Sequence, residues 1–414
     1  MFETRYKSHH DAEHEYSGLI KKERASKEDL DAYLNRQDVI SMKDNVIYIH
    51  IPFCDRICSF CNMNRKILDN TLDAYVDDLT TQILWMGKHE YFKTHKIQAI
   101  YFGGGTPTVL SPSHFEKILT TLRMVFKYSG TCEITCETTL HNLSDAHLAI
   151  FKVLGINRIS IGIQTFQSEG RKFFNRTYNK KRVLERMREI RNMFSGCISI
   201  DKIYNYPGET KEMLLDDVKQ IINLNIDSIS FYSLMIHKGS KLSEHLDSTD
   251  FSHKQDQEFH NLFVKSLLDT GEFEYLELTK LARKGKDQYC YMRVRNSNGN
   301  TIPLGRGAGG KIDCFEIYNI DFNRIMVVKS EGSIGEFANK IYGICQHPII
   351  NKQQLELLCP TSSDLFYTTI ETLVENGYLK HKENALVMSE KGIFYGNNIG
   401  GLLARVYLQS LVSS

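Results

Sequence analysis

Apolar and polar positions follow two alternating periods from about residue 46 to residue 237. Runs rich in β-branched and aromatic side chains, such as NVIYIHIPF (45–53) and IQAIYFGGG (97–105), predict strands. The stretches between them, such as residues 72–89 and 113–126, repeat apolar side chains every three to four positions and predict helices. This order predicts successive βα units around a parallel sheet. We therefore expect an α/β fold, a full or partial (β/α) barrel with its active site at the carboxyl ends of the strands.

The pattern changes at both ends of this repeat. Residues 1–44 are polar and helix-capable, with SKEDLDAYL (26–34) as the best helix. Residues 350–414 predict helices followed by a strand-turn-strand, an order similar to a winged-helix domain. We expect a helical extension at 1–44, a barrel core at 45–245, a segment that completes the active site at 246–340 and a C-terminal α+β (winged-helix-like) helix-hairpin domain at 341–414.

Charge and composition narrow the function classes. The 414 residues include 51 basic and 50 acidic side chains, a formal charge of +1, which disfavours a protein that binds nucleic acid by phosphate neutralisation. A DNA-binding regulator that uses the C-terminal module is the alternative from another class. No apolar run approaches the ~18 residues of a membrane span, and the first residues are polar. We expect a cytoplasmic monomer whose ten cysteines are thiols and metal ligands rather than disulfides.

Three cysteines stand close together after the first strand, at Cys54, Cys58 and Cys61. Their thiolates can converge on one soft metal. Because a closed zinc site or an electron-transfer cluster usually takes four ligands, three leave one metal position open for an exchangeable ligand, which implies chemistry. The alternatives are a zinc site completed by His50 or a distant cysteine such as Cys132, and a chance grouping of buried thiols.

Other chemically distinctive residues also follow predicted strands. Three glycines (103–105) follow the second strand, Glu137 ends the third, Gln164 follows the fourth and Asp201 follows the fifth. Since the carboxyl ends of parallel strands meet at one mouth, a barrel would bring these groups together with the cysteines.

The spacing C-x3-C-x2-C, with an aromatic residue before the last cysteine, resembles the radical S-adenosylmethionine (SAM) superfamily. Four ordered motifs are similar to those of its oxygen-independent coproporphyrinogen III dehydrogenase-like branch: Tyr48–Cys54, Gly103–Thr108, Arg158–Phe166 and Asp201–Thr210. The resemblance covers roughly residues 45–330. It implies a partial radical SAM barrel in which the three cysteines hold a 4Fe-4S cluster, and the unique iron binds SAM.

The resemblance also implies contacts for two SAM molecules. Tyr48 and Phe60 lie against the two SAM sites. At Gly104, Gly105 and Thr106 the backbone approaches bound SAM, and its amides can meet the methionine carboxylate. A tight turn would explain the glycines equally. Glu137 matches a carboxylate that receives polar groups of the first SAM, with a plain ion pair as the alternative.

For the second SAM, the matching residues are Gln164, Arg176, Asp201 and Met235, the last through its backbone. Most basic residues near Arg176 are expected on a solvated helix face, so the role of Arg176 rests on the resemblance alone. The implied first step is reductive cleavage of SAM to a 5'-deoxyadenosyl radical. That step needs an oxygen-free setting and a flavodoxin-like electron donor.

Departures from the branch's pattern select among its members. The dehydrogenase carries a fourth cysteine where this chain has Met63, and both the dehydrogenase and the related haem chaperone carry a proline where it has Leu140. The match to Ile163–Phe166 with Arg171, and to LGRGAGG (304–310) near a tyrosine- and arginine-rich segment, favours the anaerobic haem-degrading group, similar to anaerobilin synthase. The dehydrogenase, the chaperone and another two-SAM methyl-transfer or cyclopropane-forming enzyme remain alternatives.

Residues that would contact haem or a related tetrapyrrole substrate are not singled out by the sequence. Haem needs an apolar slot, an axial ligand and cations for its propionates, and fifteen histidines and several arginines are available. His50 and the single Trp85 are expected to be structural. The remaining cysteines are expected to be dispersed, ordinary thiols: Cys132, Cys136, Cys197, Cys290, Cys314, Cys345 and Cys359.

Overall fold

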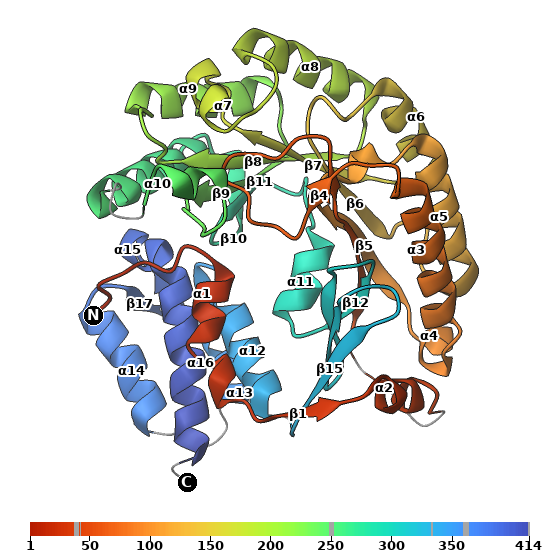
Figure 1. Cartoon of the computed structure of the whole chain (residues 1–414). Helices are drawn as coiled ribbons and strands as arrows, with labels where there is room; N and C mark the ends of the chain where they lie inside the picture. The colour runs from red at the N-terminus through yellow and green to blue at the C-terminus, as the bar shows by residue number, and fades with distance from the viewer. Residues whose placement is uncertain (37–40, 42, 248–251, 333, 359–363, 413–414) are drawn as a thin grey trace.

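An open, strongly curved sheet of thirteen strands forms the body of the protein (Figure 1). The computed structural model describes residues 1–36, 41, 43–247, 252–332, 334–358 and 364–412. The strand order is β1-β15-β14-β13-β12-β2-β5-β6-β7-β8-β9-β11-β10, and within the described residues the two outermost strands do not pair with each other. The α/β partial barrel expected from the alternating pattern is therefore confirmed.

Seven central strands run parallel to one another. They are β2 (Asn45–Ile51), β5 (Ile97–Gly104), β6 (Glu133–Thr138), β7 (Arg158–Gln164), β8 (Cys197–Tyr204), β9 (Ser228–Ser233) and β12 (Asn300–Leu304). Antiparallel strands extend the sheet beyond β12 and beyond β9. They are β13 (Gly309–Ile312), β14 (Phe315–Asn319), β15 (Ile325–Ser330) and β1 (Lys22–Ala25) on one side, and β11 (Lys280–Arg283) and β10 (Phe273–Glu277) on the other.

Helices cover the convex face of the sheet (Figure 1). They are α3 (Leu72–Gly87), α4 (Glu90–Thr94), α5 (Pro112–Val125), α6 (Asp145–Leu154), α7 (Ser168–Phe173), α8 (Lys180–Met193), α9 (Lys211–Asn223) and α10 (His253–Leu268). Short 3-10 turns lie at Ser17–Leu19, Pro107–Val109 and Lys241–Glu244. Ser111 and Ser144 each accept a hydrogen bond from the third residue of the helix that they begin, as capping residues do. These caps explain why the helical periodicity begins where it does.

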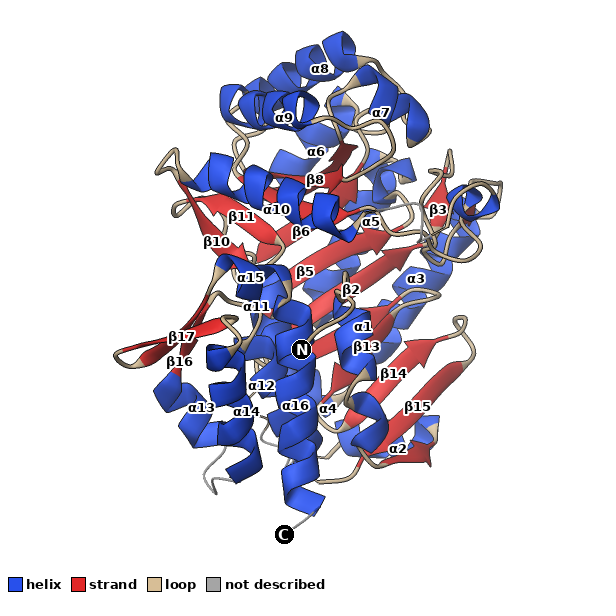
Figure 2. Cartoon of the chain, turned by 90° about the vertical axis from the view of Figure 1, so that its left-hand side faces the viewer, coloured by secondary structure: helices blue, strands red, loops and turns tan. Residues whose placement is uncertain are grey.

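A helical domain with its own apolar core packs beside the open side of the sheet (Figures 1 and 2). Its elements are α12 (Ile334–Ile344), β16 (Ile349–Asn351), α13 (Lys352–Leu358), α14 (Asp364–Glu375), β17 (Leu379–Lys382), β18 (Ala385–Met388), α15 (Glu390–Phe394) and α16 (Gly396–Val412). The expected helices and hairpin are present, and β16 joins the hairpin in the order β16-β18-β17. This order of elements is winged-helix-like.

The N-terminal segment differs from the helical extension that its composition suggests. It contains α1 (His9–His14) and α2 (Lys27–Leu34), but residues 22–25 form β1, which pairs antiparallel with β15. The sequence KERA has no apolar alternation because three of its four side chains are exposed. Its strand conformation depends on edge pairing with a neighbour distant in sequence. Ala12 and Tyr16 belong to the core of the C-terminal domain.

Two further expectations concern membrane-spanning helices and Cys359. Among the described residues, no helix is both long and apolar enough to cross a bilayer. Cys359, expected as an ordinary thiol, lies outside the described residues.

Candidate functional site

The three clustered cysteines lie in the loop that follows β2, at the carboxyl end of the parallel sheet. A two-residue strand at each end, β3 (Phe53–Cys54) and β4 (Lys66–Ile67), closes this loop by parallel pairing. The 304–310 glycine loop leaves β12 at the same end of the sheet. The loop thus has a fixed base, while the thiols of Cys58 and Cys61 remain partly accessible.

The donor set of the loop fits a soft metal centre. Burial raises the pKa of the Cys54 and Cys61 thiols, while the Arg65 side chain, which donates to the Cys61 carbonyl, favours the thiolate of Cys61. The Thr106 hydroxyl lies 3.6 Å from the Cys54 sulfur. Within the described residues no three His, Cys, Asp or Glu side chains are already gathered around one point as metal ligands. Bound iron would supply the positive charge that draws these buried thiols together as thiolates.

The glycine turn after β5 braces the cysteine loop through its backbone. Gly105 N–H donates to the Ile51 carbonyl at 2.7 Å, and Thr106 N–H donates to the Phe53 carbonyl at 2.8 Å. A Cβ on Gly105 would lie 2.5 Å from the Phe53 carbonyl oxygen, so only glycine permits this approach. These two amides are therefore occupied, and the expectation that they meet the methionine carboxylate of SAM is wrong for both.

His50 connects the strand to both neighbouring loops. Its ring hydrogen-bonds the Tyr48 hydroxyl at 3.0 Å and the Asn64 carbonyl at 2.8 Å, and its own carbonyl accepts from the Tyr75 hydroxyl. The Tyr75 hydroxyl also accepts from the backbone N–H of Arg306, 3.2 Å away. The 304–310 loop is thus fastened beside the cysteine loop, and His50 acts as a structural residue of both.

Glu137 and Asp201 place two carboxylates on the concave face of the barrel. Burial raises the pKa of Glu137 to about 7, although a hydrogen bond from the Tyr101 hydroxyl (2.7 Å) and one from the Gly104 N–H favour its ionised form. Burial also raises the pKa of Asp201, against the effect of the Lys280 ammonium. The charge of Asp201 contributes to the raised pKa of Glu137, so the two acids share one electrostatic environment.

Gln164 and Arg176 converge on Gly162. A Cβ at Gly162 would lie 2.6 Å from an Arg176 guanidinium nitrogen and 3.0 Å from the Gln164 amide nitrogen. The Arg176 guanidinium carbon is 5.8 Å from the centre of the Phe60 ring, and its charge favours the thiolate of Cys61. In the described part of the chain, the buried Nε of Arg176 has no hydrogen-bond partner. Because buried donors are normally paired, this side chain is suited to an anionic ligand.

Arg171 holds the segment around Gln164 and Arg176 in place. Its guanidinium donates to the carbonyls of Ile163 and Thr177, each at 2.8 Å, and to that of Tyr178 at 2.8 Å. These bonds join the end of β7 to the loop that carries Arg176. Gln164 itself has a φ of +68°, an uncommon conformation for a residue other than glycine. Arg176 lies in the loop between α7 and α8, not on the solvated helix face that its neighbours suggested.

The end of α7 and the loop after it contact the cysteine loop from the other side. The Ser59 hydroxyl donates to the Phe173 carbonyl at 2.9 Å, and the Asn175 side chain donates to the Ile57 carbonyl at 2.9 Å. The Phe60 ring packs edge-on against Phe174 with 5.4 Å between centroids. The cysteine loop therefore lies between the segment after β7 and the segment after β12. Met235 follows β9 at the same end of the sheet and is half-buried.

An aromatic wall lines the interior between the strands and α11 (Cys290–Asn296). Tyr101 stacks on Tyr291 with 4.6 Å between centroids, and Tyr48 lies 6.3 Å from both rings. We call Tyr48, Tyr101 and Tyr291 the tyrosine wall. Through Tyr101, this wall reaches the Glu137 carboxylate.

A fully buried ion pair fixes the segment that leads into α11. The Arg158 guanidinium binds both oxygens of Asp287, at 3.0 and 2.9 Å, and lies 4.4 Å from the Tyr289 ring centre. The Lys280 ammonium also lies 4.4 Å from the centre of the Tyr289 ring. Sequence reasoning missed Arg158, Asp287, Lys280 and Tyr101 as members of the interior, because their partners come from strands and turns remote in sequence.

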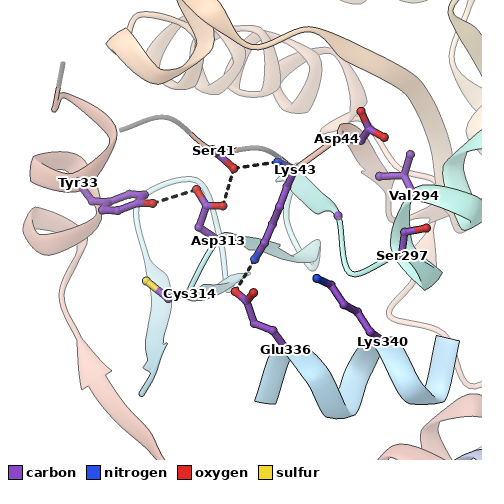
Figure 3. Close-up of a pocket in the computed structure, with 11 residues that line it drawn as sticks. Tyr33, Ser41, Lys43, Asp44, Val294, Ser297, Asp313, Cys314, Glu336 and Lys340 are labelled. Atoms are coloured by element: carbon purple, nitrogen blue, oxygen red, sulfur yellow. Dashed lines mark hydrogen bonds and ion pairs between the residues drawn. The ribbon is translucent and has the colours of Figure 1, made fainter. Parts of the chain in front are cut away.

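Two cavities lie away from the loop of Cys54, Cys58 and Cys61. One of about 560 Å³ opens at the amino ends of β2 and β12, where Tyr33 and Ser41 bind Asp313 and Lys43 pairs with Glu336 (Figure 3). The other, of about 330 Å³, brings together Cys132, Cys197 and Cys290, which were expected to be dispersed. Burial raises the pKa of all three thiols, which keeps them protonated. None of the predicted site residues lines either cavity.

Comparison with known proteins agrees with this geometry. The model of the radical SAM superfamily matches residues 48–221. The heme chaperone HemW of Lactococcus lactis is 25% identical over 385 residues, which cover 86% of this chain and 96% of that protein. The anaerobilin synthase of Escherichia coli O157:H7 is 25% identical over 282 residues, which cover 67% of this chain and 63% of that protein.

One solved structure has the same overall fold. The coproporphyrinogen III oxidase HemN of Escherichia coli superimposes with a TM-score of 0.75 over 93% of both chains, at 18% sequence identity. The cysteine loop, the braced glycine turn and the matched residues all lie in the parallel half of the barrel. The chain therefore belongs to the radical SAM superfamily, in the branch of the oxygen-independent coproporphyrinogen III oxidases with their anaerobilin synthase and heme chaperone relatives.

Proposed function

We propose that the protein opens the haem macrocycle under anaerobic conditions, releasing iron and a linear tetrapyrrole, with methyl transfer from a second SAM. The observation that carries this proposal is the second ligand-ready region beside the cysteine loop. There, the hydrogen bonds of Arg171 join the end of β7, which carries Gln164, to the loop that carries Arg176. Among the described residues the buried Nε of Arg176 has no partner, and its guanidinium carbon lies 5.8 Å from the centre of the Phe60 ring. The anaerobilin synthase relative supports haem as the substrate.

In this proposal, Cys54, Cys58 and Cys61 hold a 4Fe-4S cluster, which with SAM supplies a carbon-centred radical. The first SAM lies between the cluster loop and Glu137. Its proposed protein contacts are Tyr48, Phe60, Gly104, Gly105, Thr106 and Glu137. With the amides of Gly105 and Thr106 already occupied, we assign these two residues the role of fixing the loop and of approaching SAM through their other backbone atoms.

The second SAM occupies the region around Gly162, with Gln164, Arg176, Asp201 and Met235 as its contacts. Arg176 suits the methionine carboxylate because this half-buried cation has an Nε without a hydrogen-bond partner among the described residues. Asp201 suits a hydroxyl or amine donor. Burial raises the pKa of this carboxyl, and a hydrogen bond from such a donor would favour its ionised form. The role of this chain is to orient both molecules and to exclude water from the space between them.

The proposal includes an external electron donor of the flavodoxin type and a protein that acts as a monomer. The three-cysteine loop is partly accessible to such a donor through Cys58 and Cys61. Oxygen must be excluded, because an open iron-sulfur cluster oxidises readily.

A haem chaperone is the second candidate, and one observation favours it. The match to the Lactococcus lactis heme chaperone extends over 86% of this chain, more than the match to anaerobilin synthase. Against this, Leu140 stands where chaperones carry proline, and its side chain is buried in the barrel core. The dehydrogenase is disfavoured by Met63, a 47% exposed side chain where that enzyme carries a fourth cysteine.

The experiment is anaerobic incubation of the reconstituted protein with haem, SAM and a chemical reductant. We expect SAM-dependent loss of the haem Soret band, with 5'-deoxyadenosine and an opened tetrapyrrole of methyl-sized mass gain by mass spectrometry. Omission of SAM and the Cys58→Ala variant are the controls. Haem that binds and survives would favour the chaperone, and decarboxylation of coproporphyrinogen would favour the dehydrogenase.

The second SAM has its own test. Gln164→Ala and Asp201→Asn should abolish methyl transfer while leaving the iron-sulfur spectrum unchanged. Lys172→Ala changes an exposed residue of α7 next to Arg171. This variant is the matched control and should retain methyl transfer. Full methyl transfer in both site variants would contradict a second SAM at this position.

A further inference from the structure

The first helix of the chain is fastened to the C-terminal domain. Ala12 is fully buried, and a Cβ on Gly401 of α16 would lie 3.0 Å from the Ala12 carbonyl oxygen. Glu15 pairs with Arg405 of α16 at 2.6 Å. These contacts fix α1 beside α16, at the open side of the barrel (Figure 1).

The chain just before α1 is fastened to the barrel. Arg5 donates to the Tyr204 hydroxyl at the end of β8 and pairs with Asp256 of α10 at 3.1 Å. Lys7 donates to the Leu234 carbonyl at 3.1 Å, next to Met235. Residues 5–16 therefore bridge the two cores close to the proposed second SAM site.

Two histidines of α1 remain exposed while the helix is held in place. The rings of His9 and His10 lie 4.0 Å apart, and His10 Nδ1 is 3.6 Å from a Glu13 carboxylate oxygen. Surrounding atoms desolvate His9 and, together with His10 and Arg295, lower its pKa to about 4. His9 thus presents an exposed imidazole, a ring that can bind iron, on a helix that is held in place.

A cation of α11 lies near α1 and beside the tyrosine wall. Arg295 of α11 is close enough to His9 and Glu13 for its charge to affect both. Its guanidinium carbon lies 5.7 Å from the centre of the Tyr291 ring. Tyr291 stacks on Tyr101, whose hydroxyl donates to Glu137. A series of contacts thus runs from Arg295 to the proposed first SAM site.

We propose that His9 is the axial ligand of haem iron and that Arg295 binds a haem propionate, with the macrocycle facing the tyrosine wall. This inference rests on the proposed function, in which haem is the substrate. Haem supplies four nitrogen ligands, so one protein imidazole completes the site. Release of iron would leave His9 free for the next haem.

Haem binding to the full-length, anaerobically prepared protein without SAM tests the ligand. We expect an iron–histidine stretch in the resonance Raman spectrum of the ferrous complex. His9→Ala should abolish this signal and weaken haem binding at least tenfold, and added imidazole should restore the signal. His14→Ala, an exposed histidine on the same helix, is the matched control and should keep both the signal and the affinity.

Haem dimethyl ester, which lacks the propionate charges, tests Arg295. Arg295→Ala should weaken the binding of haem at least fivefold but leave the binding of the ester unchanged, and Arg295→Lys should recover part of the loss. Equal weakening of both ligands would overturn the role of Arg295.

The outcomes separate this inference from the proposed function. Haem that is consumed, while His9→Ala keeps an unchanged iron–histidine signal, overturns the ligand assignment and leaves the function standing. A wild-type protein that neither binds nor consumes haem overturns the function, and this inference with it.

Discussion

With Glu137 as a contact of the first SAM, as proposed above, its raised pKa predicts how SAM binding depends on pH. Burial raises this pKa from an ordinary value of 4.5 to about 7. An ionised carboxylate accepts hydrogen bonds from SAM better than a protonated one, so affinity should follow the ionised fraction. For the protein without SAM the sign is opposite. Because the folded-state pKa lies above the unfolded one, stability should fall as the pH rises from about 4.5 through 7.

The size of the effect follows from the titration curve. With a pKa near 7, about 9% of Glu137 is ionised at pH 6 and about 91% at pH 8, a tenfold change worth about 1.4 kcal/mol. The SAM amino group titrates in the same range. We therefore take the ratio of the wild-type affinity to that of Glu137→Gln, which cancels this contribution, and expect the ratio to rise about tenfold from pH 6 to pH 8.

The assay is calorimetric titration of the reconstituted, unreduced protein with SAM at pH 6, 7 and 8. Tyr101→Phe provides the internal check. It removes the 2.7 Å hydrogen bond that favours the ionised carboxylate, so the rise in affinity should move to higher pH. A ratio that stays constant between pH 6 and pH 8, with Tyr101→Phe behaving like wild type, would refute the reasoning.

The remaining predictions concern the interior and the cysteine loop. Asp287→Ala leaves the buried Arg158 charge unpaired and should lower the free energy of unfolding by about 3–5 kcal/mol in urea denaturation, whereas Arg158→Met with Asp287→Leu should lose much less. The stability that this pair provides should also fall as acid protonates Asp287, whose pKa lies well below its usual range because of Arg158. Gly105→Ala places a Cβ against the Phe53 carbonyl and should reduce iron bound per chain after reconstitution, while Gly130→Ala, in open space, should not. Met63→Cys should leave the iron content at about four per chain, because three cysteines already define the cluster; a higher content would argue for a fourth ligand position.

The sequence predicts the parallel half of the fold well, for a local reason. Strands such as β2 and β5 are buried on both faces, so their composition alone identifies them. Strand β1 was missed because its polar side chains carry no burial pattern and only pairing with β15 makes it a strand. Long-range edge pairing leaves no periodic trace in a single segment.

In the candidate site, too, local motifs can be predicted from the sequence and long-range contacts cannot. Spacing was enough to propose the three cysteines as ligands, since a metal loop is a local motif. The Arg158–Asp287 pair joins residues 129 positions apart, and no local signal connects them. The role of the amides of Gly105 and Thr106 was misjudged because sequence shows that a backbone can approach something, but not which partner it meets. Here that partner is the strand leading into the cysteine loop.

The bridge formed by the first residues sets an order of events during synthesis. Arg5 bonds to the Phe394 carbonyl, 389 positions later, and Tyr6 bonds to Asn398, 392 positions later. At about 5–20 residues per second, the ribosome needs roughly 20–80 s to reach these partners. The N-terminal segment must therefore wait, undocked, while the barrel folds. During this interval the side of the barrel beside which α1 later docks stays open, which leaves a period for inserting the iron-sulfur cluster before the N-terminal segment is in place.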